Sequence, residues 1–247
     1  MCTPTVFPRT ALSMLVLLCC SGFLKGWKFH VAPMQGYTNS SLRKLFSLLS
    51  EEAVLWTEME KVSDLLDDRA MEKRLHDEND RYTVLQFGGS CPESLRACVE
   101  RVNSAYSFQE YNLNFGCPSI QSGGADYGAY LMTQPELSCA LVRTLKEAAP
   151  HVPISVKCRI GVHDRYDSYD DSADYYHTLH GYVSALAGAG VDHVVVHARV
   201  AVLQGLSPLK NRSVPSLQPD LVRAVARDFP HLRFTLNGGI SSAADVQ

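Results

Sequence analysis

Short apolar runs alternate along the chain with longer stretches in which apolar residues recur every three or four positions. The runs predict strands that are covered on both faces, because successive side chains of a strand point to opposite faces. The longer stretches predict helices, because their spacing puts apolar side chains on one face. Seven strands are expected, at 29–34, 53–59, 83–87, 110–115, 154–160, 193–198 and 234–237. Helices are expected at 39–49, 90–105, 134–149, 172–189 and 217–228, with one more starting at Ser241.

This alternation predicts an α/β protein with a parallel sheet and helices outside it. We interpret the strands as continuous apolar runs, which are typical of strands covered on both faces. A doubly wound open sheet and a TIM (β/α)8-type barrel both fit the pattern. The barrel is favoured because polar or reactive side chains end nearly every strand, and a barrel brings strand ends to one site. These residues are Met34, Glu58, Gln86, Asn114, Cys117, Lys157, Arg159, His197 and Asn237.

The chain has 247 residues, and roughly 250 is the usual size of such a barrel. Because only seven strands are found, we expect residues 27–247 to form an incomplete barrel that lacks its eighth strand. Residues 1–26 are expected to be a leader or a disordered extension. Their apolar run, 11–20, is too short for a membrane span of about 20 residues and is similar to the core of a targeting signal. Localisation is therefore expected to be cytoplasmic or organellar, without stable membrane association.

Composition narrows the function classes. A net charge of -3 argues against a strongly basic nucleic-acid-binding module, although a local basic patch remains open. The eight cysteines include no CxxC pair, which argues against a zinc site, so no metal is expected.

One cysteine stands in a sequence that defines its position. The stretch 111–118, Tyr-Asn-Leu-Asn-Phe-Gly-Cys-Pro, reads as a strand that stops at a turn. Gly116 allows a sharp bend, and Pro118 restrains the backbone after it. Cys117 is therefore expected at the mouth of the barrel beside the Asn114 amide, as a candidate acid, base or nucleophile.

Several further strand ends favour a flavin mononucleotide (FMN) site. Lys157 could neutralise negative charge on a reduced ring, and His197 could donate to a ring carbonyl or a phosphate. Gln86 offers a donor and an acceptor to a flat heterocycle. Gly238 and Gly239, which end the seventh strand before a helix, suit one half of a phosphate-binding turn.

Spaced motifs identify a family. The chain resembles the tRNA-dihydrouridine synthases over about residues 29–247. The motifs are Ala32-Pro33-Met34, Gln86-Phe87-Gly88-Gly89, Asn112 to Pro118, Val156 to Gly161 and Asn237-Gly238-Gly239-Ile240. His197-Ala198-Arg199, Leu203 to Pro208, Asn211-Arg212 and Asp167-Ser168-Tyr169 resemble the A-type branch, the tRNA-dihydrouridine(20/20a) synthases.

The resemblance implies a flavin-dependent reductase that converts uridine in the tRNA D-loop to 5,6-dihydrouridine, with NADPH as electron donor. FMN would lie among Pro33, Met34, Gln86, Lys157, His197, Asn237, Gly238 and Gly239. Cys117 would give a proton to C5 of the uracil after hydride transfer to C6. Asn114, Arg159 and Arg199 would lie near the uracil. The family's C-terminal helical domain, which grips tRNA, is expected to be missing, and a monomer is favoured.

Two other functions remain open. One is an FMN-dependent barrel oxidoreductase that acts on a small molecule. The other is a truncated barrel that binds RNA without turnover.

Overall fold

The computed structural model describes residues 29–75, 83–118, 127–242 and Asp245. Its main feature is a parallel sheet of six strands in the order β1-β2-β3-β4-β6-β8. The strands are β1 (Leu55–Lys61), β2 (Thr83–Gly88), β3 (Glu110–Phe115), β4 (Ile154–Arg159), β6 (His193–His197) and β8 (Arg233–Asn237).

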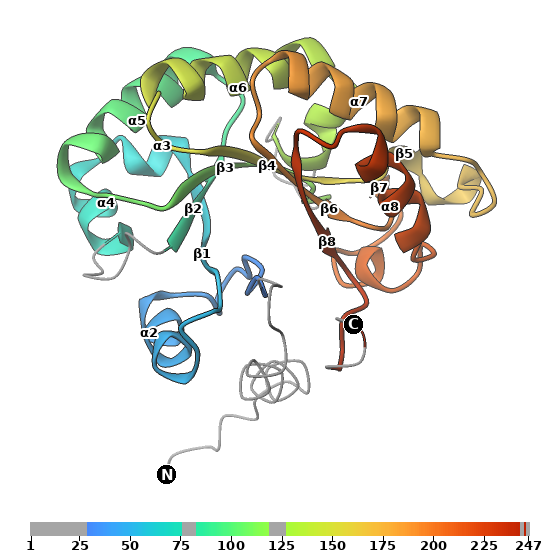
Figure 1. Cartoon of the computed structure of the whole chain (residues 1–247), viewed down its shortest axis with the longest axis horizontal. Coiled ribbons are helices and arrows are strands. Elements are labelled where there is room, and N and C mark those ends of the chain that lie inside the picture. Colours follow the sequence, from blue (N-terminus) through green and yellow to red (C-terminus); the bar gives the residue numbers. More distant parts are fainter. Residues whose placement is uncertain (1–28, 76–82, 119–126, 243–244, 246–247) are drawn as a thin grey trace.

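The spatial order of these strands is their order in the chain, so every connection steps in the same direction. Right-handed crossovers that all step one way put every helix on the same face of the sheet. Figure 1 shows this arrangement: the sheet curves like an arch, helices follow its outer side, and β1 and β8 lie toward its two ends. A doubly wound sheet would carry helices on both faces, so the predicted α/β barrel architecture is confirmed.

The five main helices agree with the sequence pattern. They are α2 (Ser40–Leu49), α5 (Pro92–Ala105), α6 (Pro135–Ala148), α7 (Tyr176–Gly188) and α8 (Pro219–Asp228). A proline occupies the first turn of α5, α6 and α8, where its missing N–H costs no hydrogen bond. Helix α2 is capped by Asn39, whose side chain accepts from the Leu42 N–H.

Helix α7 begins four residues later than predicted, because Asp170 and Asp174 form local turns with the N–H groups of Ser172 and Tyr176. The short helices were not predicted. They are α3 (Val62–Leu65), α4 (Asp68–Leu75), η4 (Gly128–Thr133), η5 (Tyr166–Ser168) and η6 (Lys210–Arg212). Beyond β8 the structure describes only part of the region where a further helix was expected.

The first predicted strand is mostly wrong. In place of a strand over 29–34, His30 forms one parallel bridge with Val54, supported by hydrogen bonds from Val31 N to Val54 O and from Val54 N to Phe29 O. After that bridge the chain turns, and the Met34 carbonyl accepts from the backbone of two following residues. Pro33 has no N–H to donate, which helps to end the pairing here.

The strands are not continuous apolar runs, and that interpretation was wrong. In β3, Tyr111, Leu113 and Phe115 belong to the hydrophobic core that the helices cover. The residues between them, Asn112 and Asn114, point to the other, concave face, because side chains alternate along a strand. The concave face therefore carries many polar side chains beside a small apolar cluster of Trp56, Val84 and Val195, and its polar part carries the candidate site.

A small parallel sheet lies beyond the carboxyl ends of the main strands. It pairs β5 (Val162–Arg165) with β7 (Ala201–Gln204), the segments that follow β4 and β6. The buried Asn211 side chain holds β7 in place by pairing with both the N–H and the C=O of Val202. This extension was not predicted.

Among the described residues, no helix has the length and apolar character needed to cross a membrane. The predicted leader, residues 1–26, lies outside the described part of the chain.

Candidate functional site

The register of the sheet brings the predicted polar residues into two rows on the concave face. Asn114 in β3 is aligned with Lys157 in β4. Two residues farther along, Arg159, His197 and Asn237 are aligned across β4, β6 and β8. Since partners in a parallel register point the same way, these side chains gather near the carboxyl ends of neighbouring strands.

Cys117 lies in a turn that Asn114 holds. The Asn114 Oδ1 atom accepts from the N–H groups of Gly116 and Cys117 at 3.1 and 3.0 Å. The Cys117 side chain is half-buried. Gly116 passes so close to β4 that a Cβ atom there would lie 3.2 Å from the Lys157 carbonyl oxygen, so glycine allows the turn to rest on the neighbouring strand.

The Gln86 side chain is buried, and both ends of its amide already have partners. Its Oε1 atom accepts from Asn114 Nδ2 at 2.9 Å, and its Nε2 atom donates to Asn112 Oδ1 at 2.8 Å. Gln86 therefore lies beside Asn114, and both ends of its amide, which was predicted to face the flavin, bind other side chains of the protein.

Lys157 carries an uncompensated charge. It makes no hydrogen bond or ion pair with another described residue, and its pKa is lowered to about 8 by burial and by the positive charge of Arg159. Cys117 is close enough to Lys157 to act on its pKa in the opposite direction. The predicted thiol and ammonium groups are thus neighbours.

His197 is buried and its Nε2 atom has no hydrogen-bond partner in the part of the chain that the structure describes. Its pKa is lowered to about 2, first by burial and then by Arg159, Lys157, Arg199 and Arg212. The imidazole is therefore neutral at physiological pH, and its buried Nε2 atom is left without a hydrogen-bond partner among the described residues.

The Gly-Gly turn after β8 packs directly on this imidazole. Gly238 and Gly239 have φ values of 97° and 76°, which favour glycine. A Cβ atom on Gly238 would lie 2.6 Å from His197 Cδ2, and one on Gly239 would lie 2.4 Å from a methyl group of Leu217. The turn predicted to bind phosphate thus borders the orphaned His197 atom, and Asn237 precedes it.

Arg159 is buried and binds the turn that carries Cys117. Its guanidinium donates to the carbonyl oxygens of Gly116 at 3.1 Å, Asn211 at 2.9 Å and Val200 at 3.3 Å. Arg199 donates to the Pro215 carbonyl, while its buried Nε atom has no partner among the described residues. Both arginines were predicted near the substrate; the structure shows that both donate hydrogen bonds to backbone carbonyls around the site.

Pro33 and Met34 belong to the turn at the β1 end of the sheet. They follow the His30 bridge beside β1, whereas Asn237 ends β8 at the other side of the sheet (Figure 1). Their described hydrogen bonds are local, such as that from the Met34 N–H to Thr38 Oγ1 at 3.0 Å.

Sequence reasoning missed three residues of the site. Arg212 adds positive charge near His197, Asn112 supports Gln86, and Asn211 anchors the extension. The alternation of asparagines in β3 was the signal for Asn112, but reading the strand as continuously apolar hid it.

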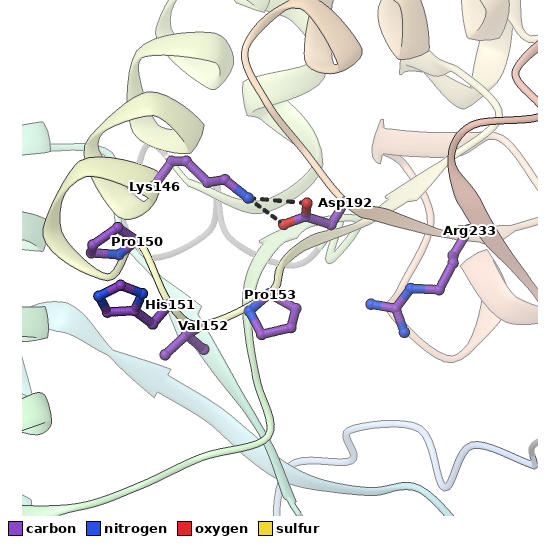
Figure 2. A pocket seen from close by; sticks show the side chains of 7 residues that line it. All are labelled: Lys146, Pro150, His151, Val152, Pro153, Asp192 and Arg233. Carbon is purple, nitrogen blue, oxygen red and sulfur yellow. Dashed lines mark hydrogen bonds and ion pairs between the residues drawn. The ribbon is translucent and has the colours of Figure 1, made fainter.

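A shallow pocket also lies at the opposite, amino end of the strands. Figure 2 shows its lining, in which the Lys146 ammonium pairs with both carboxylate oxygens of Asp192 at 3.0 and 2.7 Å. Because Lys146 is already paired, this pocket lacks the open charge of the concave face.

The carboxyl-end cluster combines a thiol, a lysine of lowered pKa, a neutral imidazole with an orphaned nitrogen, and nearby arginines. No acidic group is among the main influences on the pKa of Lys157 or His197. An arrangement of this kind suits an anionic ligand with hydrogen-bond acceptors.

Comparisons with known proteins agree with this geometry. The family model "Dihydrouridine synthase (Dus)" matches residues 30–247. The chain is 40% identical over 215 residues to a tRNA-dihydrouridine(20/20a) synthase of Pseudomonas syringae pv. tomato, covering 87% of this chain and 61% of the relative. It is 36% identical over 217 residues to the protein of that name from Synechocystis sp., covering 88% and 62%. For the one from Escherichia coli K12, identity is 34% over 220 residues, covering 89% and 61%.

The chain thus spans about three fifths of the length of these curated relatives. The match of the family model covers the strands, the turn of Cys117 and the Gly-Gly turn together. The chain therefore belongs to the dihydrouridine synthase family.

Proposed function

We propose that this protein reduces uridine in the D-loop of tRNA to 5,6-dihydrouridine, with FMN as cofactor and NADPH as electron donor. Relatives that share 34–40% identity with this chain are named tRNA-dihydrouridine(20/20a) synthases. The observation that carries the proposal is the juxtaposition of Cys117 with Lys157, whose positive charge has no partner among the described residues.

The residues present fit FMN. The orphaned Nε2 atom of His197 and the unpaired ammonium of Lys157 offer the hydrogen-bonding and charge partners that a flavin or its phosphate needs. The residues that would hold the cofactor are Pro33, Met34, Gln86, Lys157, His197, Asn237, Gly238 and Gly239. When bound and reduced by NADPH, FMN supplies a hydride to C6 of the uracil.

Cys117 acts as the acid in this reaction and gives its thiol proton to C5 of the uracil. Asn114 fixes the turn from which the thiol projects, through its two hydrogen bonds to the backbone of that turn. Arg159 holds the same turn from the other side through the Gly116 carbonyl, and it lies near the uracil together with Arg199.

The substrate is a base that leaves the RNA stack to enter the site, since a concave site at the end of a barrel is out of reach of a stacked base. The positive charge of Arg199 and Arg212 suits the phosphates of the nucleotide that enters.

The first test is whether the protein binds FMN, which gives it a yellow colour. The 247-residue chain is purified, mixed with FMN and passed through a desalting column; retained flavin absorbance supports the proposal. The loaded protein is then given NADPH and an unmodified tRNA transcript, and the gain of two hydrogens in a D-loop uridine is measured by mass spectrometry of nuclease fragments.

Two results would redirect the proposal. A protein that stays colourless but binds tRNA would favour a barrel that binds RNA without turnover. A yellow protein that oxidises NADPH with a small enone or pyrimidine, yet leaves tRNA unchanged, would favour a small-molecule oxidoreductase.

A further inference from the structure

Four polar side chains on the concave face form a continuous chain of hydrogen bonds, which we name the amide relay: Asn114, Gln86, Asn112 and Ser155. Asn114 Nδ2 donates to Gln86 Oε1 at 2.9 Å, Gln86 Nε2 donates to Asn112 Oδ1 at 2.8 Å, and Asn112 Nδ2 donates to Ser155 Oγ at 2.8 Å. Gln86, Asn112 and Ser155 are also register partners on three adjacent strands.

The relay can run in only one direction. Its first oxygen, Asn114 Oδ1, faces the backbone N–H groups of Gly116 and Cys117, and a backbone N–H can only donate. The Asn114 amide must therefore present its nitrogen to Gln86, which fixes the orientation of Gln86 and then of Asn112. At the far end the Ser155 hydroxyl can donate or accept, so it adapts to this direction.

This direction decides what Asn114 can offer to a ligand. Both lone pairs of its Oδ1 atom are used by the turn that carries Cys117. One of its two amide hydrogens goes to Gln86, and one remains on a half-buried side chain. Asn114 is thus a donor only, and a ligand atom that meets it must be an acceptor, such as a carbonyl oxygen of a pyrimidine.

We propose that Asn112 is a positioning residue of this site, because it anchors Gln86 and thereby keeps Asn114 oriented as a donor beside Cys117. Asn112 is fully buried, so it acts through Gln86 and does not touch the ligand. The proposal rests on the proposed function for the identity of the ligands, but not for the relay itself.

Two substitutions at this position separate hydrogen bonding from shape. Asn112→Leu keeps the branched shape and the number of heavy atoms of the side chain, although it is larger, but it cannot accept a hydrogen bond from Gln86 Nε2, so the Gln86 amide loses its acceptor. Asn112→Asp keeps an acceptor for Gln86, whether its carboxyl group is ionised or protonated, and the Ser155 hydroxyl can turn to donate to it. Ser155→Ala removes the end of the relay, together with the hydrogen bond of Ser155 to Glu110, and leaves the Gln86 to Asn112 bond in place.

Leu113→Ala is the matched control for lost stability. Leu113 is the next residue of β3, is equally buried and faces the helices, so its truncation weakens the core without touching the relay.

The first measurement needs no cofactor. In the ligand-free chain, NMR follows hydrogen exchange of the Gln86 side-chain amide. Exchange of this amide should be slow in the wild type and in Asn112→Asp, Ser155→Ala and Leu113→Ala. In Asn112→Leu it should be at least about tenfold faster, because a buried hydrogen bond is lost. Unchanged exchange in Asn112→Leu would overturn the proposal.

The second measurement titrates each variant with FMN and follows the visible absorbance of the flavin. Asn112→Leu should bind roughly tenfold more weakly than the wild type, while Asn112→Asp and Leu113→Ala stay within about threefold. Equal weakening in Asn112→Leu and Asn112→Asp, or in Asn112→Leu and Leu113→Ala, would refute a positioning role. If the wild type binds no FMN, the proposed function fails for this chain, and the exchange data alone decide on the relay.

Discussion

The orphaned Nε2 atom of His197 lies 2.8 Å from the point where a Cβ atom on Gly238 would stand. Because Gly238 has no side chain, the turn after β8 can pack against a buried nitrogen that has no hydrogen-bond partner among the described residues. Two strands, β6 and β8, meet at this point, because His197 and Asn237 are register partners.

Gly238→Ala should lower FMN affinity by at least about tenfold, because the new methyl group clashes with the His197 imidazole. It should also destabilise the fold by roughly 1–3 kcal/mol, because a φ of 97° is strained for a residue other than glycine. Flavin titration and chemical denaturation measure the two effects. Gly181→Ala in α7 is the control: a Cβ there meets nothing within 4 Å, so stability should rise slightly and flavin binding should not change.

Cys117→Ala should retain FMN and lose nearly all dihydrouridine formation, because the proton donor is gone while the turn, held through its backbone, is kept. Mass spectrometry of tRNA fragments gives the product, and absorbance gives the bound flavin. Cys91→Ala, at an exposed thiol ahead of α5, should behave like the wild type. Product formed by Cys117→Ala at the wild-type rate would contradict the acid role.

Lys157 should make stability depend on alkaline pH. Its pKa of about 8 in the folded protein is below the ordinary lysine value near 10.4, so between these values the unfolded chain binds a proton that the folded chain lacks. The free energy of unfolding should therefore rise with pH in this window, by about 1.4 kcal/mol per pH unit from this group.

Lys157→Met removes this contribution. Denaturant titrations between about pH 7.5 and 10 should give a smaller rise for the variant than for the wild type, and the variant should be at least as stable near neutral pH, where the buried charge costs most. Its turnover should nevertheless fall sharply. A parallel loss of stability and activity would point to a structural role for Lys157.

Glu110 should matter for stability and not for the site. Burial raises its pKa, but the hydrogen bond and charge of His193, with help from Ser155 and Arg233, lower it overall. The stabilisation by the ionised carboxylate is complete above the ordinary glutamate pKa and is lost as pH falls through the lowered value.

Glu110→Gln leaves His193 and Arg233 without their anion and should cost about 3 kcal/mol at neutral pH. Denaturant titration at about pH 7 and pH 3 should show this difference shrinking in acid. Flavin affinity should stay close to the wild-type value, because Glu110 begins β3 while the site lies at the carboxyl ends.

The interior strands were predictable because each is rich in apolar residues and ends at a glycine, a proline or a polar residue. The strand over 29–34 was not, since a single bridge to Val54 depends on how Pro33 and the next turn meet β1. The β5–β7 pairing was missed because its hydrogen bonds join segments about 40 residues apart, and nothing local marks them.

The sequence by itself determined the order of strands and helices, the turn that presents Cys117, and the glycines at positive φ, because these follow from local backbone sterics and the period of apolar side chains. Only the tertiary structure decided which polar side chains line the concave face, that Asn112 supports Gln86, and that four cationic residues lower the pKa of His197. Those properties arise from register between strands and from burial, which depend on residues far apart in the chain.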